Sequence, residues 1–246
     1  MPENGLAGVR ALVTGASRGF GRGIATALSK AGAPVVGVAR DRGPLEELRA
    51  RLGESFTVVP ADAADPSSLA SSSTPTVRPS WCSTPSPPRC RGRSSTHTWQ
   101  TFSPNWDIDV AHVFHWVREA LLAPLKPGRT VITLSSGAAL FGSPLSGYAG
   151  GKAAIRWLTG YAAEESRRAA LGTRFVSVLP QLTPATALGA VFAAAYAARQ
   201  GAGAAPSTGG PALTPGQPGQ AIVDLTGPGY DQDAYLLTAA GLRPLP

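Results

Sequence analysis

The sequence predicts an α/β fold, in which a parallel β-sheet is covered by helices. Short apolar segments that read as buried strands alternate with helical segments. A glycine-rich turn joins the first strand to the first helix. The length of 246 residues, 43% of them hydrophobic, suits one large domain over residues 1–246.

The expected elements follow one another along most of the chain. Strands are predicted at residues 9–13, 34–40, 56–60, 131–134, 175–180 and 234–238. Helices are predicted at residues 24–30, 44–52, 102–122, 148–170 and 187–199. Residues 201–220 are rich in Gly and Pro and read as a mobile loop. His112 and His115, on the helix over 102–122, are interpreted as packing or surface residues rather than metal ligands, and no metal site is expected.

The turn after the first strand has the glycine spacing Gly-x-x-x-Gly-x-Gly. Glycines between a strand and a helix let the backbone approach a pyrophosphate, and the helix N-terminus supplies N–H groups and a favourable dipole. The turn therefore predicts a dinucleotide site, although such a sequence is also compatible with a simple turn. The residues assigned to this site are Thr14, Gly15, Ser17, Arg18, Gly19 and Gly21.

The end of the second strand bears on the choice of dinucleotide. An acid is usual there when the ligand is NAD, but this chain has Arg40. With Arg18 it offers two guanidinium groups, which suit a 2′-phosphate and favour NADP over NAD. Solvated surface arginines are the alternative, and Asp41 weakens the preference. After the third strand, Asp62 is predicted either to contact the adenine or to cap the next turn.

A second set of polar residues lies around the strand at 131–134. Ser135 and Ser136 end this strand, and Tyr148 and Lys152 follow on a helix, four residues apart and so on one face. A phenol has a pKa of about 10, and a nearby ammonium group lowers it. The Tyr could then exchange a proton near neutral pH while a Ser holds the substrate oxygen. This pattern suits a carbonyl and alcohol pair, although a Tyr and Lys pair also occurs on ordinary surface helices.

Together the two motifs, Thr14-Gly15-x-x-x-Gly19-x-Gly21 and Tyr148-x-x-x-Lys152, resemble the short-chain dehydrogenase/reductase family over about residues 8–65 and 97–190. The resemblance implies a Rossmann-type doubly wound parallel sheet with helices on both faces, a nicotinamide cofactor and hydride transfer. It implies that Tyr148 is the acid/base, and that Lys152 binds the ribose and lowers the Tyr pKa. Ser136, or else Ser135, would orient the substrate oxygen.

The resemblance also implies further roles. A family Asn that helps to relay protons is replaced by Asp109, and Thr183 or Thr186 would lie near the nicotinamide amide. The loop over 201–220 would shape the pocket for a small carbonyl or alcohol substrate. Two helices would pair between subunits of a homodimer or homotetramer.

Residues 66–95 do not fit this pattern, because they are rich in Ser, Pro, Thr and Arg where the family has a helix and then an apolar central strand. A shifted reading frame is one explanation, since residues 74–85 can be encoded so that skipping two bases yields Ala-Asp-Arg-Pro-Ala-Val-Val-Val-Leu-Asn-Ala. A genuine insertion is the alternative. The central strand is therefore doubtful, and a catalytically impaired or frame-damaged relative is the second functional hypothesis.

Composition excludes several other classes. The net charge is +7, but residues 66–106 contribute four Arg and no acid, so the charge does not indicate a nucleic-acid protein. Both cysteines, Cys82 and Cys90, lie in the same segment and do not form a metal or disulfide pattern. The N-terminus does not read as a signal peptide, and the apolar runs are too short for a membrane span, so a cytoplasmic protein is expected.

Overall fold

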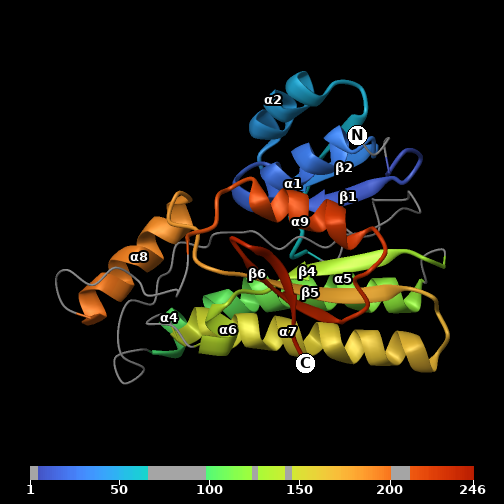
Figure 1. Cartoon of the computed structure of the whole chain (residues 1–246). Helices are drawn as coiled ribbons and strands as arrows, with labels where there is room; N and C mark the ends of the chain where they lie inside the picture. Colours follow the sequence, from blue (N-terminus) through green and yellow to red (C-terminus); the bar gives the residue numbers. More distant parts are fainter. Residues whose placement is uncertain (1–4, 66–97, 124–126, 142–145, 201–210) are drawn as a thin grey trace.

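The strands form two sheets in the computed structural model, which describes residues 5–65, 98–123, 127–141, 146–200 and 211–246 (Figure 1). The first sheet has the order β1-β2-β3, all parallel, with β1 at Ala11–Thr14, β2 at Val35–Ala39 and β3 at Phe56–Pro60. The second has the order β4-β5-β6-β7, with β4 at Thr130–Leu134, β5 at Arg174–Pro180, β6 at Ala234–Thr238 and β7 at Gly241–Pro244. β4, β5 and β6 are parallel, and β7 turns back antiparallel.

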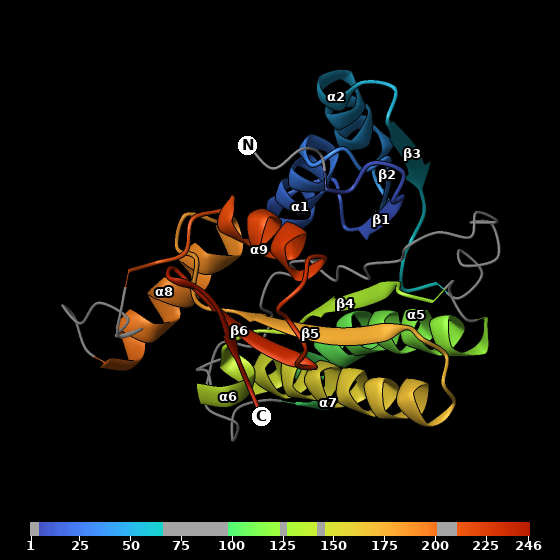
Figure 2. The ribbon, with the colours of Figure 1, turned by 45° about the vertical axis from the view of Figure 1, so that its right-hand side comes forward.

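Helices connect these strands, as expected for an α/β fold. They are α1 at Gly19–Lys30, α2 at Arg42–Leu52, α4 at Trp99–Phe102, α5 at Ala111–Leu122, α6 at Ala138–Phe141, α7 at Ser146–Arg168, α8 at Ala187–Gln200 and α9 at Gln217–Leu225. A short π-helix, η2 at Trp106–Val110, leads into α5. In two views α1 and α9 lie together on one side of the second sheet, and α5 and α7 run along the other (Figures 1 and 2).

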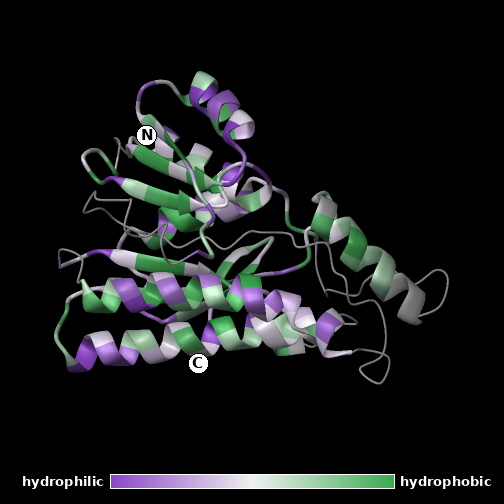
Figure 3. Cartoon of the chain, turned by 180° about the vertical axis from the view of Figure 1, so that it is seen from behind, coloured by the Kyte–Doolittle hydropathy of each residue, from purple (hydrophilic) through white to green (hydrophobic). Residues whose placement is uncertain are grey.

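Alternation along the strands explains the two covered faces, because neighbouring side chains in a strand point to opposite sides. Ile132 and Val176 pack with α1 and α9, whereas Val131 and Phe175 pack with α5 and α7. The strands are mostly hydrophobic, whereas α5 and α7 alternate between hydrophilic and hydrophobic residues along their outer sides (Figure 3). The predicted fold class, a parallel sheet with helices on both faces, is therefore confirmed.

Among the described strands, those of the first sheet contact those of the second through packed side chains and not through backbone hydrogen bonds between strands. One core contains Val13 of β1, Ile24 of α1, Ile222 of α9 and Ile132 of β4. On the opposite side Trp116 of α5, 1% exposed, packs against Leu12 and Val38, and its indole Nε1 donates to the Ala63 carbonyl at 2.8 Å. The doubtful central strand of residues 66–95 lies outside the described residues.

The segment over 102–122 is helical as predicted, but it is not one uniform α-helix. It is divided into α4, which ends at Phe102, the π-helix η2 and α5. A π-turn holds one more residue than an α-turn, so it rotates the helix that follows. Within α5 the buried residues Val113, Trp116, Val117 and Ala120 share one face at regular helical spacing, and Phe114 lies outside that face and is exposed.

The predicted loop over 201–220 is also wrong at its end, because α9 begins at Gln217. Pro218 lies in the first turn, where a helix tolerates proline. Gly219 permits close packing, since a Cβ there would lie 2.7 Å from the Gly23 carbonyl oxygen. Residues 201–210 lie outside the described part of the chain. The short elements α6 and β7 were not predicted from the sequence.

Among the residues described, none of the helices combines the length and the apolar character that a membrane span requires.

Candidate functional site

The glycine-rich turn between β1 and α1 has the backbone geometry that its glycines predict. Gly15 and Gly19 have φ values of +67° and +55°, in the left-handed region that favours glycine. A Cβ built on Gly19 has no atom within 4 Å, so its glycine is explained by backbone conformation and not by crowding. Arg18 is the N-cap residue of α1 and is exposed. The N-terminus of α1 thus lies beside the exposed Arg18 and Gly19.

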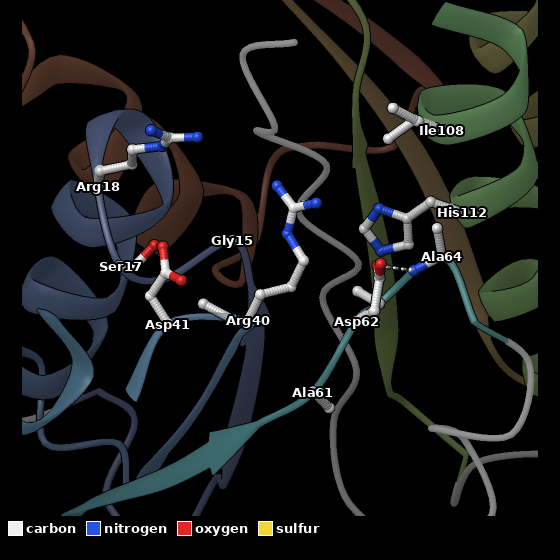
Figure 4. Close-up of a pocket in the computed structure, with 12 residues that line it drawn as sticks. Gly15, Ser17, Arg18, Arg40, Asp41, Ala61, Asp62, Ala64, Ile108 and His112 are labelled. Atoms are coloured by element: carbon white, nitrogen blue, oxygen red, sulfur yellow. Dashed lines mark hydrogen bonds between the residues drawn. The ribbon is translucent and has the colours of Figure 1, made fainter. Parts of the chain in front are cut away.

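A pocket lies beside this turn and brings together five of the predicted residues, namely Gly15, Ser17, Arg18, Arg40 and Asp62 (Figure 4). The side chains of Arg18 and Arg40 reach it from the turn and from the end of β2. Thr14 and Gly21, also predicted, are buried in β1 and α1 and do not line it. A pyrophosphate group and a ribose phosphate have matching partners here, namely N–H groups and guanidinium groups.

Of the two roles predicted for Asp62, the structure shows the capping of the turn. Its Oδ1 accepts a hydrogen bond from the Ala64 N–H at 3.0 Å, which caps the turn after β3. The same side chain lines the pocket (Figure 4). The capping role is therefore seen directly, and the predicted contact with adenine stays a prediction.

Tyr148 and Lys152 lie together on α7, where their spacing predicts them. The Lys152 Nζ is 5.5 Å from the centroid of the Tyr148 ring. It also donates to the carbonyl oxygen of Leu134, the last residue of β4, at 3.4 Å. The end of β4 and the first turns of α7 thus bring the phenol, the ammonium group and the serine pair into one region.

The two serines after β4 have different surroundings. Ser135 is buried, and its Oγ donates to the Lys152 carbonyl at 2.6 Å, which ties the strand end to α7. Ser136 is half-buried, and its Oγ accepts from the Ala138 N–H at 3.2 Å, so its own proton can be donated elsewhere. This difference favours Ser136 over Ser135 for contact with a substrate.

Asp109 makes a buried ion pair with Lys152. Its Oδ2 lies 3.1 Å from the Lys152 Nζ, and the two side chains are 3% and 6% exposed. Asp109 belongs to the π-helix η2, which packs against α7. The residue expected to alter a proton relay therefore contacts the lysine of the predicted site directly.

His112 is a pocket residue that sequence reasoning did not assign to the site. It is buried on α5, lines the same pocket as Asp62, and lies beside it in the close-up view (Figure 4). Desolvation by burial lowers its pKa from 6.5 to about 4, against a smaller opposing effect of the Asp109 charge. Its position three residues after Asp109, on one helix face, was the available signal.

Thr183, the remaining predicted residue, is buried after β5, and its Oγ1 donates to the Gln181 carbonyl at 3.3 Å. Thr186 donates to the Thr183 carbonyl at 2.9 Å. Neither threonine lines the pocket described above. Over Tyr148 lies the ring of Phe192 from α8, with 4.7 Å between the ring centroids.

Groups of acidic, His or Cys side chains able to hold a metal ion are absent from the described part of the chain.

Comparison with known proteins gives three findings. Residues 10–75 match the family model described as short chain dehydrogenase, and the match ends inside the segment of unusual composition. L-xylulose reductases from Mus musculus and Cavia porcellus are each 59% identical over 44 residues. That stretch is 18% of this chain and 18% of each relative.

Solved structures resemble almost the whole chain. A 3-ketoacyl-(acyl-carrier-protein) reductase from Brucella melitensis, complexed with NADH, aligns with a TM-score of 0.70 at 22% identity over 91% of this chain and 92% of its own. A dehydrogenase/reductase from Sinorhizobium meliloti 1021 aligns with a TM-score of 0.75 at 23% identity over 94% of both chains. At this identity the likeness concerns the fold.

The depressed pKa of His112 predicts a pH dependence of stability. As the pH falls from about 6.5 to about 4, the unfolded chain binds a proton at this imidazole and the folded chain does not. We expect the free energy of unfolding to decrease by up to about 3 kcal/mol over this range because of His112. Urea unfolding at several pH values measures this change in the free energy of unfolding.

The matched comparison uses His112→Gln and His115→Gln, on the same helix. The first substitution should remove this part of the pH dependence and the second should retain it. An equal pH dependence in both variants would contradict the assignment.

Proposed function

We propose that the chain belongs to the short-chain dehydrogenase/reductase family and that it is an oxidoreductase that interconverts a carbonyl and an alcohol with a nicotinamide dinucleotide. The observation that carries the proposal is the convergence of Tyr148, Lys152 and the serine pair at the end of β4. The glycine turn with its pocket supports the cofactor part. When bound, the dinucleotide supplies the hydride that reaches the carbonyl carbon, or accepts it in the reverse direction.

The side chains of this chain handle the proton. In reduction, Tyr148 gives its phenolic proton to the carbonyl oxygen, so that one hydride and one proton convert the carbonyl into an alcohol. The Ser136 hydroxyl donates a hydrogen bond to the same oxygen and orients it. The Lys152 ammonium, 5.5 Å from the phenol ring, stabilises the phenolate that remains.

NADP is the proposed form of the cofactor. Arg18 and Arg40 both line the pocket, and two guanidinium groups match the geometry and charge of a 2′-phosphate. Asp41 lines the same pocket and works against this preference through its charge. Asp62 is a second carboxylate of this lining, so the proposal of NADP over NAD depends on the match between guanidinium groups and a phosphate and not on the net charge of the pocket.

A small molecule with an apolar portion beside its carbonyl fits this proposal. Phe192 is buried against the Tyr148 ring, so a substrate oxygen that reaches the phenol lies next to an apolar surface. The cytoplasmic location predicted from the sequence remains part of the proposal, as does the absence of nucleic-acid and membrane partners.

Self-association through α5 and α7 is a further part of the proposal. Phe114 and Leu122 on α5, and Trp157 and Tyr161 on α7, are large exposed side chains, and the last two rings lie 5.8 Å apart. Burying such side chains favours association. We expect a homodimer or homotetramer by sedimentation velocity, weakened by Trp157→Glu. A monomer at all concentrations would contradict this part.

A catalytically impaired relative that only binds a dinucleotide is the second candidate. Two observations favour it: β1 and β4 belong to separate sheets among the described strands, and the family match ends at residue 75. The gene's nucleotide sequence tests the shifted frame, because codons incompatible with the alternative frame would exclude it.

Tyr148→Phe separates the two candidates. The substitution removes the only proton that the phenol can give and leaves the ring, so we expect turnover to decrease by about 10²–10⁴-fold while dinucleotide affinity is retained. Tyr161→Phe, on the exposed side of the same helix, is the matched control and should retain turnover. Unchanged turnover in Tyr148→Phe would remove this residue from the mechanism.

Titration with NADPH and NADH tests the cofactor site itself. We expect saturable binding with NADPH preferred, and we expect Arg40→Ala to reduce the preference because one guanidinium partner of the 2′-phosphate is lost. Fluorescence or calorimetry measures both affinities. Equal affinities for the two dinucleotides would contradict NADP selectivity. If neither dinucleotide binds, the proposed cofactor site is contradicted.

A further inference from the structure

The ion pair between Asp109 and Lys152 is the most completely buried pair of opposite charges among the described residues. Charges that are removed from water interact strongly, and each would be costly to bury without the other. The Lys152 Nζ has two further neighbours, the Leu134 carbonyl and the Tyr148 ring. The charge that Tyr148 experiences is therefore that of the pair, not of an isolated ammonium group.

This environment differs from the one expected for a phenol activated by lysine alone. An ammonium group next to a phenol favours the phenolate, whereas a carboxylate next to it favours the protonated phenol. Asp109 lies 3.1 Å from the Lys152 Nζ, so the two effects act from almost the same place and oppose each other.

We propose that Asp109 is a positioning residue that anchors the Lys152 ammonium group and offsets its charge, so that Tyr148 keeps its proton to a higher pH than Lys152 alone would permit. Asp109 acts through Lys152 and does not itself touch the reacting atoms. If the proposed function holds, on which this consequence rests, the site is biased towards giving a proton, which is the role of Tyr148 in carbonyl reduction.

The other titratable groups near the pair do not offset the Lys152 charge as Asp109 does. His112 on α5 faces the pair, and its lowered pKa of about 4 leaves it neutral near pH 7. His115 contributes only the smallest influence on His112. Asp107, also on η2, is exposed and accepts a hydrogen bond from the Ser103 hydroxyl at 3.0 Å. The strand β4 and the short helices α4 and α6 contain no titratable side chain, and neither does the described side-chain part of α8.

Spectroscopic titration of the Tyr148 phenol tests the proposal without cofactor or substrate. Phenolate absorbance is followed with pH, and the curve of the Tyr148→Phe chain is subtracted to isolate this residue. In Asp109→Asn, measured with and without Tyr148→Phe, we expect the midpoint to decrease by about one pH unit or more, because the Lys152 charge is no longer offset. Asp109→Glu, which keeps the charge, should retain a midpoint near that of the unmodified chain.

Asp107→Asn is the matched control, because it removes a charge from the same π-helix at a site away from Lys152, and its midpoint should not change. An unchanged midpoint in folded Asp109→Asn, or an equal decrease in Asp107→Asn, would overturn the proposal. If circular dichroism shows that Asp109→Asn does not fold, Lys152→Met replaces it. There the phenol faces Asp109 without the ammonium group, so the midpoint should rise, and no rise would overturn the proposal.

These readouts separate the inference from the proposed function. If the chain shows the expected midpoints but reduces no carbonyl, the role of Asp109 is supported and the proposed oxidoreductase activity is contradicted. If the chain reduces a carbonyl and the Tyr148 midpoint is unchanged in Asp109→Asn, the proposed activity is supported and the role of Asp109 is contradicted.

Discussion

The described sheets are joined by side chains packed across them, and the rest of the structure depends on that packing. Trp116 lies against β1 and β2 from a helix that otherwise covers β4 and β5, while Ile24 and Ile222 fill the opposite side. An aromatic side chain of this size, fully buried, contributes several kcal/mol of stability, on the order of 3–5. The glycine turn follows a strand of one sheet and the Tyr148–Lys152 pair follows a strand of the other, so the relative position of these two parts of the candidate site depends on this packing.

The burial of Lys152 is the second constraint, and it affects both stability and chemistry. An ammonium group shielded from water needs partners, and here a carboxylate and a backbone carbonyl supply them. Ser135 donates its hydroxyl hydrogen bond to the Lys152 carbonyl, whereas the half-buried Ser136 accepts a hydrogen bond from the Ala138 N–H. The residues around this lysine thus stabilise its charge and fix its backbone, and both effects hold its ammonium group close to Tyr148.

The sequence predicts most strands correctly because apolar runs bounded by turn residues, such as Phe56–Pro60, carry their own signal. It also predicts the pairing of Tyr148 with Lys152, since helical spacing alone places both on one face. The burial of Trp116 against β1 and β2 and the pocket position of His112 were missed because they depend on packing between segments that are distant in the sequence, which local periodicity does not reveal. The helix α9 was missed because its Pro218 and Gly219 read as loop residues, although Gly219 is explained by close contact with α1.

The division into two sheets also has consequences for how the molecule opens. Groups of elements that share many internal contacts and fewer with their neighbours tend to unfold as cooperative units, at a free energy below that of global unfolding. Among the described residues, β1, β2 and β3 with α1 and α2 contact the second group through the core that contains Ile24 and Ile222 and through Trp116. A ligand that touches both groups would raise the free energy needed to part them by mass action. Hydrogen exchange in the N-terminal strands would then become slower when such a ligand is bound. Exchange at β1 would report the binding of a ligand that also contacts Tyr148, more than a hundred residues away along the chain.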